Sequence, residues 1–255
     1  MPLLEVKSLT KRFGGVMALD HISLRVDEDE IVGLIGPNGA GKTSFFNCVT
    51  GLLRADQGEI FFKGSPGRLN DLPCHKILEA GVARTFQNLR IFKNMTVLEN
   101  VATGFHSRTK SGLLDAFLRT RRLRTEEAMV FSKSMEFLRL IGLQNQGNEI
   151  AGQLPYGSQK RLEVARALAC DPKLLLLDEP VAGMNPSEKQ EIAALIRKIR
   201  ERGVAVLLIE HDMKFVMPLS DRVIVMDEGE KIAEGSAEEV QKNPRVIQAY
   251  LGEDN

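Results

Sequence analysis

The sequence predicts an α/β protein with an antiparallel β region near its N-terminus and a helical segment inserted into the middle of the chain. Three observations support this fold class. Apolar runs rich in β-branched residues alternate with helical patterns, and the strand-like segments toward the two ends are half-polar. The stretch from about Leu89 to Gly152 carries almost no strand pattern.

Four near-continuous apolar runs predict strands of a parallel sheet that is covered on both faces. Three of them are followed closely by a helical pattern. The expected strands are Ile31–Ile35, Leu174–Leu177, Val204–Ile209 and Arg222–Met226, and the expected helices are Lys42–Thr50, Ser187–Arg202 and Met213–Leu219.

Four half-polar segments predict an antiparallel sheet with one face in water. These segments are Leu4–Leu9, Ile22–Val26, Ile60–Phe62 and Lys231–Glu234. In the middle of the chain, Met95–Gly104 and Thr125–Ile141 have helical patterns, with Thr96 and Thr125 as the expected N-caps.

The composition excludes several classes of protein. The 255 residues include 34 basic and 34 acidic side chains, and the resulting net charge of zero argues against a dedicated nucleic-acid binder. The longest apolar run, Val204–Ile209, has six residues, whereas a membrane-spanning helix needs roughly 20. The first residues lack the pattern of a signal peptide.

The cysteines and histidines form no pattern typical of a disulfide framework or a zinc site. Cys48, Cys74 and Cys170 are widely spaced, so we expect reduced thiols. The four histidines are scattered, so we expect no metal cage made by protein side chains alone. An ion held between the protein and a bound phosphate stays open.

The segment from Gly36 to Thr43 matches the pattern G-x-x-x-x-G-K-[ST] and lies between a predicted strand and a predicted helix, where this motif belongs. Its glycines let backbone N–H groups turn toward phosphate oxygens, and the helix N-terminus adds positive potential. We expect Lys42 to contact the β- and γ-phosphates and Thr43 to ligate Mg²⁺. The expected phosphate-binding residues are Gly36, Pro37, Asn38, Gly39, Ala40, Gly41, Lys42, Thr43 and Ser44.

The apolar run Leu174–Leu177 ends in two carboxylates, Asp178 and Glu179. At the carboxyl end of a strand, Asp178 is expected to hold Mg²⁺ through water, and Glu179 to accept a proton from the attacking water. A solvated acidic turn after a core strand is the alternative. The phosphate loop favours the functional interpretation.

These motifs, in this order, resemble an ATP-binding-cassette ATPase over nearly the full chain. The resemblance implies a P-loop NTPase core of that type. It also implies that Gln87 senses Mg²⁺ and the attacking water and contacts a membrane subunit, that His211 contacts the γ-phosphate, and that Phe13 stacks on adenine. Each residue also has an ordinary interpretation: a surface amide, a helix cap and an apolar residue before a turn.

The resemblance implies two domains. Residues 1–88 and 159–255 would form the nucleotide-binding core with the antiparallel β subdomain, and residues 89–158 the inserted helical subdomain with the family's signature motif. That motif, usually L-S-G-G-Q, falls at Leu154–Ser158, where Pro155, Tyr156, Gly157 and Ser158 depart from it. Because it acts on ATP held by a partner cassette, the departure is expected to weaken the partner's site.

A second departure lies after Glu179, where Asn185 stands in place of a frequent aspartate. Asn185 suits a helix N-cap, with Pro186 at the first helical position and Glu188 completing a capping box.

Four further segments resemble one ATP-binding subunit of bacterial branched-chain amino acid importers: Ala83–Phe92, Leu154–Gly157, Ile209–Met213 and Ala249–Gly252. This resemblance implies a peripheral ATPase subunit on the cytoplasmic face of the inner membrane, which couples MgATP hydrolysis to solute transport. Its implied partners are transmembrane permease subunits, a second and non-identical cassette and, indirectly, a periplasmic solute-binding protein, with no nucleic acid. Cassettes for urea, amides or lipopolysaccharide share part of the pattern, and a soluble non-transport cassette ATPase is a further alternative.

Overall fold

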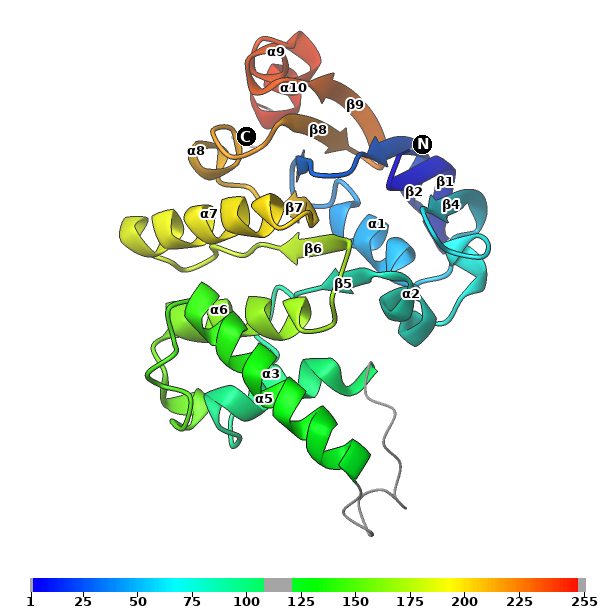
Figure 1. The fold of residues 1–255 in the computed structure, drawn as a ribbon. Helices are drawn as coiled ribbons and strands as arrows, with labels where there is room; N and C mark the ends of the chain where they lie inside the picture. Colours follow the sequence, from blue (N-terminus) through cyan, green and yellow to red (C-terminus); the bar gives the residue numbers. More distant parts are fainter. Residues whose placement is uncertain (1, 108–120, 252–255) are drawn as a thin grey trace. The chain divides into compact units, whose positions relative to one another are not determined.

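The computed structural model describes residues 2–107 and 121–251 (Figure 1). Contacts divide the chain into two compact units: unit 1 consists of Met1–Gln87 and Lys173–Asn255, and unit 2 of Asn88–Pro172. The sequence predicts an inserted segment over residues 89–158. Unit 2 continues to Pro172 because it includes helix α6 (Tyr156–Leu168), which packs on the other helices of this unit.

A six-stranded sheet forms the centre of unit 1, with strand order β5-β6-β7-β3-β8-β9. Five strands are parallel, and β9 pairs antiparallel with β8 at one edge. The strands are β3 (Ile31–Ile35), β5 (Val82–Arg84), β6 (Leu174–Asp178), β7 (Ala205–Ile209), β8 (Arg222–Asp227) and β9 (Glu230–Gly235). The four predicted apolar strands are confirmed within one residue at each end, because continuous burial produces continuous apolar sequence.

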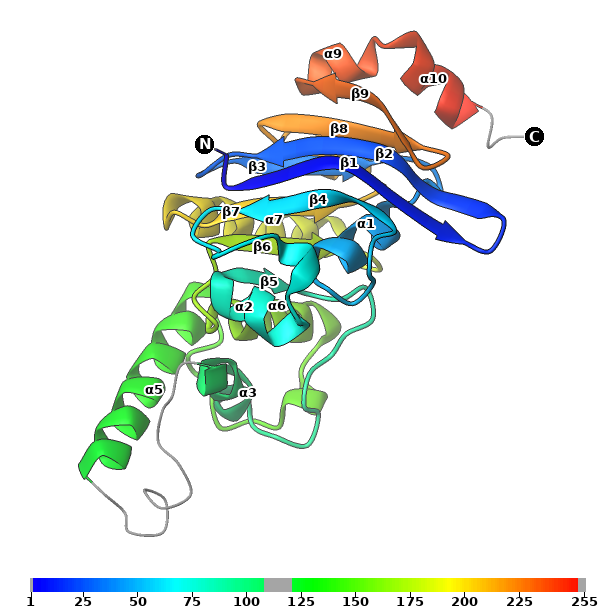
Figure 2. The same ribbon diagram turned by 90° about the vertical axis from the view of Figure 1, so that its right-hand side faces the viewer.

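A three-stranded antiparallel sheet, with the order β2-β1-β4, forms the second sheet of unit 1 (Figure 2). Its strands are β1 (Leu4–Phe13), β2 (Val16–Val26) and β4 (Gln57–Phe62). The prediction that Lys231–Glu234 belongs to this sheet is wrong, since β9 pairs with β8 in the six-stranded sheet. A half-polar pattern indicates that one face of a strand is exposed to water. An edge strand of either sheet has such a pattern, so the pattern does not identify the sheet.

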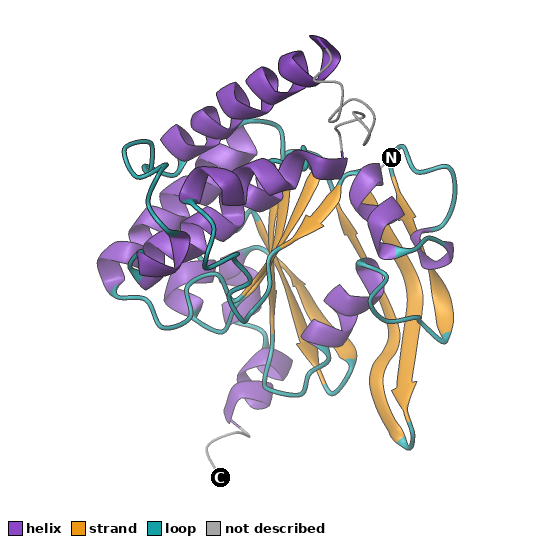
Figure 3. Ribbon diagram, turned by 90° about the horizontal axis from the view of Figure 1, so that it is seen from below, coloured by secondary structure: helices purple, strands orange, loops and turns teal. Residues whose placement is uncertain are grey.

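Helix α1 (Lys42–Val49) packs into the core that the two sheets share, where Phe45, Phe46 and Val49 are fully buried. Figure 3 shows the strands of the two sheets as separate groups. Helix α7 (Pro186–Glu201) packs along β7 and buries its apolar face. The other helices of unit 1 are η1 (Leu69–Asp71), α2 (Cys74–Ala80), α8 (Met213–Val216), α9 (Ala237–Gln241) and α10 (Pro244–Leu251).

The expected cap of α7 is confirmed. The side chain of Asn185 accepts a hydrogen bond from the N–H of Glu188, whose carboxylate accepts one from the N–H of Asn185. Pro186 occupies the first helical position, where its missing N–H is not needed.

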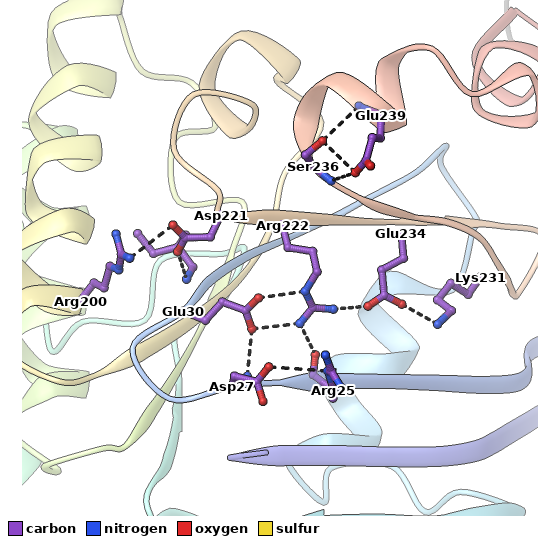
Figure 4. A network of polar contacts seen from close by, with 11 residues as sticks. Arg25, Asp27, Glu30, Arg200, Asp221, Arg222, Lys231, Glu234, Ser236 and Glu239 are labelled. Atoms are coloured by element: carbon purple, nitrogen blue, oxygen red, sulfur yellow. Dashed lines mark hydrogen bonds and ion pairs between the residues drawn. The ribbon is translucent and has the colours of Figure 1, made fainter. Parts of the chain in front are cut away.

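An ion-pair network joins the two sheets at the edge where β3 and β8 begin (Figure 4). Arg222 forms two hydrogen bonds with the Glu30 carboxylate at 2.9 Å, a further one with Glu234, and donates to the carbonyl of Arg25 at 2.8 Å. Arg25 belongs to the three-stranded sheet and Arg222 to the six-stranded one. The guanidinium therefore fixes one sheet on the other.

Unit 2 is helical. Helices α3 (Val97–Thr103), α5 (Arg121–Leu140) and α6 pack on one another, with short turns η2 (Gly104–Ser107) and η3 (Ala151–Gln153) between them. The predicted cap at Thr96 is confirmed by a capping box with Glu99. The predicted cap at Thr125 is wrong, because α5 begins at Arg121. Arginine and leucine favour helix, so the helix extends past Thr125 toward the N-terminus. Within the described ranges, no helix is long and apolar enough to cross a membrane.

Candidate functional site

The loop between β3 and α1 requires glycine at two positions. The φ angles of Gly36 and Gly41 are +150° and +96°. A Cβ atom on Gly36 would collide with the carbonyl oxygen of Met226, and one on Gly41 with that of Ala18. The loop thus turns tightly into α1, whose first N–H groups have no carbonyl partner within the helix. Such a helix start is a binding site for anions.

Lys42 is the first residue of α1. Its Nζ donates to the carbonyl oxygens of Gly36 at 2.6 Å and Pro37 at 2.7 Å, so the ammonium group lies against its own loop. Thr43 is exposed at the helix start, and Ser44 is half-buried. In the rest of the loop, Asn38 and Gly39 are exposed, and Pro37 and Ala40 are buried.

Asp178 is the last residue of β6, and its side chain is 3% exposed. Its Oδ2 accepts a hydrogen bond of 2.6 Å from Nη2 of Arg84, at the end of β5. The other Arg84 amino group, Nη1, donates to Oδ1 of Asn47 in α1 at 2.7 Å. This connection of Asp178 to Arg84, and through Arg84 to Asn47, was not found from the sequence, because the two residues lie 94 and 131 positions from Asp178 along the chain.

Glu179 has a left-handed backbone, with φ at +46°, directly after β6. Its N–H donates to the carbonyl of Ile209 at 3.0 Å, and its Oε2 accepts a hydrogen bond of 3.0 Å from the Gln87 amide. A non-glycine residue in this conformation stores roughly 1 kcal/mol of strain, and such residues cluster at functional sites. The structure therefore brings Gln87 and Glu179 together.

His211 follows β7, two residues after Ile209, which is paired with Asp178 in the neighbouring strand. Its side chain is 66% exposed, and Nδ1 lies 3.9 Å from Oε2 of Glu210. The interpretation of His211 as a helix cap is wrong, because Asp212 caps α8.

Glu210 is a buried carboxylate that the sequence analysis missed. It is 1% exposed and accepts hydrogen bonds from the N–H groups of Val181 and His211 at 3.0 and 3.2 Å. Burial raises the pKa of this carboxyl above its usual value. Glu210 thus fixes the turn after Glu179 to the turn that carries His211. An acidic residue directly after the apolar run of β7 was the available signal.

Phe13 ends β1 and is half-exposed at the β1–β2 hairpin, with the Lys11 ammonium 5.6 Å from the ring centroid. An exposed aromatic ring of this kind offers a flat surface for stacking.

In unit 2, the four residues at the position of the signature motif begin helix α6. Pro155 occupies the N-cap position, and no side chain caps the helix there. Tyr156 is 45% exposed, whereas Gly157 and Ser158 are buried. The Ser158 hydroxyl accepts a hydrogen bond of 3.1 Å from Arg161 in the same helix.

The residues expected to bind a divalent cation have a suitable chemistry. Thr43 offers a hydroxyl, Gln87 an amide and Asp178 a carboxylate, and hard cations such as Mg²⁺ prefer oxygen ligands. Among the described residues, no group of three histidine, cysteine or acidic side chains is placed to hold a metal ion. The hydroxyl, amide and carboxylate oxygens suit an ion that is shared with a phosphate ligand.

A family model described as "ABC transporter" matches residues 19–182 of the chain. The chain belongs to this family. The match includes the phosphate loop, Gln87, Asp178 and Glu179, and it excludes Phe13 and His211. A second family model, described as "Branched-chain amino acid ATP-binding cassette transporter", matches residues 230–255. The resemblance inferred from the motifs is confirmed, and with it an ATP-binding, ATP-hydrolysing function.

Similar proteins extend over nearly the whole cassette. The high-affinity branched-chain amino acid transport ATP-binding protein BraF of Pseudomonas aeruginosa is 46% identical over 99% of this chain and 98% of its own. The corresponding protein LivG of Salmonella typhimurium has the same identity and coverage.

Solved structures confirm the predicted fold class. The ADP conformation of MJ1267, a cassette of an ABC transporter, is similar with a TM-score of 0.84 and 32% identity over 99% of both chains. The dimeric post-hydrolysis state of the cassette MJ0796, bound to ADP and phosphate, has a TM-score of 0.76 and 25% identity over 92% of this chain and 98% of its own.

Proposed function

We propose that this cassette binds MgATP and couples its hydrolysis to the import of branched-chain amino acids through partner permease subunits. The hydrogen bond between Gln87 and Glu179, in a unit that also contains a glycine loop opening a helix, is the structural observation that supports the chemistry. The substrate class is supported by the 46% identity to two transport proteins named for these amino acids.

The phosphate loop provides the binding part of this function. Residues Gly36 to Ser44 supply backbone N–H groups at the start of α1, and Lys42 supplies a full positive charge to the β- and γ-phosphates. The Lys42 ammonium donates to two loop carbonyls. ATP replaces these neutral acceptors with phosphate oxygens, a stronger pairing. Phe13 offers its exposed ring to adenine.

Magnesium would be held by Thr43, Gln87 and, through water, Asp178, and when bound it supplies positive charge to the phosphate oxygens. Glu179 accepts a proton from the attacking water. The Gln87 amide orients the Glu179 carboxylate by donating a hydrogen bond of 3.0 Å to it. His211 contacts the γ-phosphate, and its exposed side chain is available for that contact.

The chain pairs with a second, non-identical cassette in this proposal. The cassette MJ0796, which is similar to this chain, forms a dimer. In such a pair, Pro155, Tyr156, Gly157 and Ser158 face the partner's ATP. Pro155 has no N–H or hydroxyl, and Tyr156 stands where the usual motif has its first glycine. The site that receives this motif therefore lacks donors that stabilise transition-state charge. We expect this chain's own nucleotide to be hydrolysed faster than its partner's.

The assembly would sit on the cytoplasmic face of the inner membrane, with a periplasmic solute-binding protein as an indirect partner and no nucleic acid. The test is uptake of labelled leucine, isoleucine and valine in cells that lack this chain, complemented with wild-type or Glu179→Gln protein. Restoration by the wild type alone supports the proposal. Uptake that is unchanged by loss of the chain, together with altered uptake of urea or a short amide, would reassign the substrate.

A further inference from the structure

Arg84 is a buried charge whose role the proposed chemistry does not explain. It ends β5, and its side chain is 6% exposed. The guanidinium carbon lies over the rings of both Phe46 and Phe86, 5.4 and 5.2 Å from their centroids. Arginine is almost never this buried unless it is paired.

The guanidinium connects three separate segments of unit 1. Nη2 donates to Asp178 at 2.6 Å and Nη1 to Asn47 at 2.7 Å, whereas Nε has no hydrogen-bond partner among the described residues. The planar fork thus spans the space between the end of β6 and helix α1. A lysine has one nitrogen and cannot make this two-point connection with the same geometry.

Each of the three segments also contains one of the residues that would hold magnesium. Asp178 is contacted directly. Asn47 lies four residues after Thr43 in α1, so both are on one face of that helix. Phe86, which packs on the guanidinium, directly precedes Gln87. One rigid side chain therefore relates the positions of all three oxygen donors.

We propose that Arg84 is a positioning residue that holds Thr43, Gln87 and Asp178 in the arrangement required for magnesium-dependent nucleotide binding. This inference rests on the proposed function. Arg84 contacts neither nucleotide nor metal in this proposal, and it acts through Asn47, Phe86 and Asp178. When a residue that orients a metal ligand by a hydrogen bond is removed, metal affinity typically falls by about 10- to 100-fold.

The experiment measures binding of an ATP analogue with an imido bridge between the β- and γ-phosphorus atoms, which is not hydrolysed. Calorimetric titration of the full chain is performed with Mg²⁺ and with EDTA, and the ratio of the two affinities is the magnesium gain. In Arg84→Met we expect this gain to fall about tenfold. Affinity in EDTA should stay within about twofold, because the phosphate loop and Lys42 are untouched.

Two companion variants separate positioning from simple charge neutralisation. Asn47→Ala removes one end of the bridge but leaves the Arg84–Asp178 ion pair, so a lower magnesium gain in this variant supports positioning. It also serves as the test if Arg84→Met fails to fold. Arg84→Lys keeps the positive charge but lacks the two-pronged guanidinium. Relative to Arg84→Met, it should bring the melting temperature closer to the wild-type value than it brings the magnesium gain.

Arg222→Met is the matched control, because it removes another paired arginine of unit 1 far from these ligands in the chain. It should lower the melting temperature and leave the magnesium gain unchanged. A wild-type gain in both Arg84→Met and Asn47→Ala would overturn the inference. Wild-type protein that shows no magnesium-dependent binding would instead count against the proposed function itself.

Discussion

The six-stranded sheet has an arginine paired with a carboxylate at each end of its strands, but the hydrogen bonding of the two arginines differs. Where β3 and β8 begin, all three nitrogens of Arg222 have partners. Where β5 and β6 end, Arg84 leaves Nε without a partner among the described residues, and it contacts Asp178, a proposed ligand. The first edge neutralises its charges internally. The second holds charged groups in place for a ligand.

The partners of an ion pair, more than its burial, therefore indicate its role. Substitutions at the Arg222 edge should change stability without changing nucleotide binding. Substitutions of Arg84, Glu179 or Lys42 should change nucleotide binding or hydrolysis, whatever they do to stability. Four predictions test this separation, in order of decreasing expected effect.

The largest effect is expected for Glu179→Gln. Removing a positioned base typically lowers the rate by about 10²–10⁴-fold. The amide has the same shape, so nucleotide binding and the unfolding free energy should be retained. Phosphate release by the assembled transporter is the measurement. Turnover within about twofold of wild type would assign the base to another residue.

Arg222→Met should be the most destabilising of the four changes. It leaves Glu30 and Glu234 without their shared cation, and we expect the free energy of unfolding to fall by about 2 kcal/mol, less than for a fully buried pair. Urea denaturation of the full chain measures this loss. Lys242→Ala is the matched control, because its ion pair with Glu238 is exposed on both sides and should contribute almost nothing. A parallel loss of nucleotide affinity in Arg222→Met would show that the two edges are coupled.

Lys42→Ala should weaken ATP binding at least tenfold, which corresponds to about 1.4 kcal/mol. The side chain donates to carbonyls of its own loop and lies outside the apolar core, so the unfolding free energy should change little. Calorimetric titration gives the affinity, with Lys63→Ala as a control at an exposed ion pair. Unchanged affinity would remove Lys42 from the binding site.

Glu210→Gln should have the smallest effect, visible as a change in pH dependence. Burial raises the pKa of Glu210 in the folded state above the usual 4.5. The folded protein then binds this proton more tightly than the unfolded chain, so wild type loses stability as the pH rises from 4.5 through the raised pKa. The variant lacks this loss. Unfolding free energies of both proteins at pH 5 and pH 8 measure it, and a pH-independent difference would contradict the assignment.

The core strands were predictable from the sequence because burial on both faces leaves only apolar residues, as in Ile31–Ile35. Strand β5 was not predicted, since it has three residues and ends in Arg84. The sheet that contains β9 was assigned wrongly, because a half-polar pattern identifies an edge and not a neighbour. The neighbour of a strand in its sheet depends on tertiary contacts, which a local sequence pattern does not encode.

The candidate site divides in the same way. The phosphate loop and the pair Asp178–Glu179 could be identified because their chemistry is continuous in sequence. Arg84 and Asn47 could not, since a charge in a strand and an amide in a helix acquire meaning only through a partner far along the chain. Their roles, like those of Gln87, His211 and Phe13, stay predictions.

The left-handed backbone at Glu179 has a consequence for protein engineering. Glycine adopts this conformation without steric cost, so the backbone alone favours glycine at this position. A selection that rewards only heat resistance would therefore accept the loss of the carboxylate. Screens for more thermostable variants of this ATPase should measure turnover at every round, because a stabilising substitution at residue 179 would abolish hydrolysis.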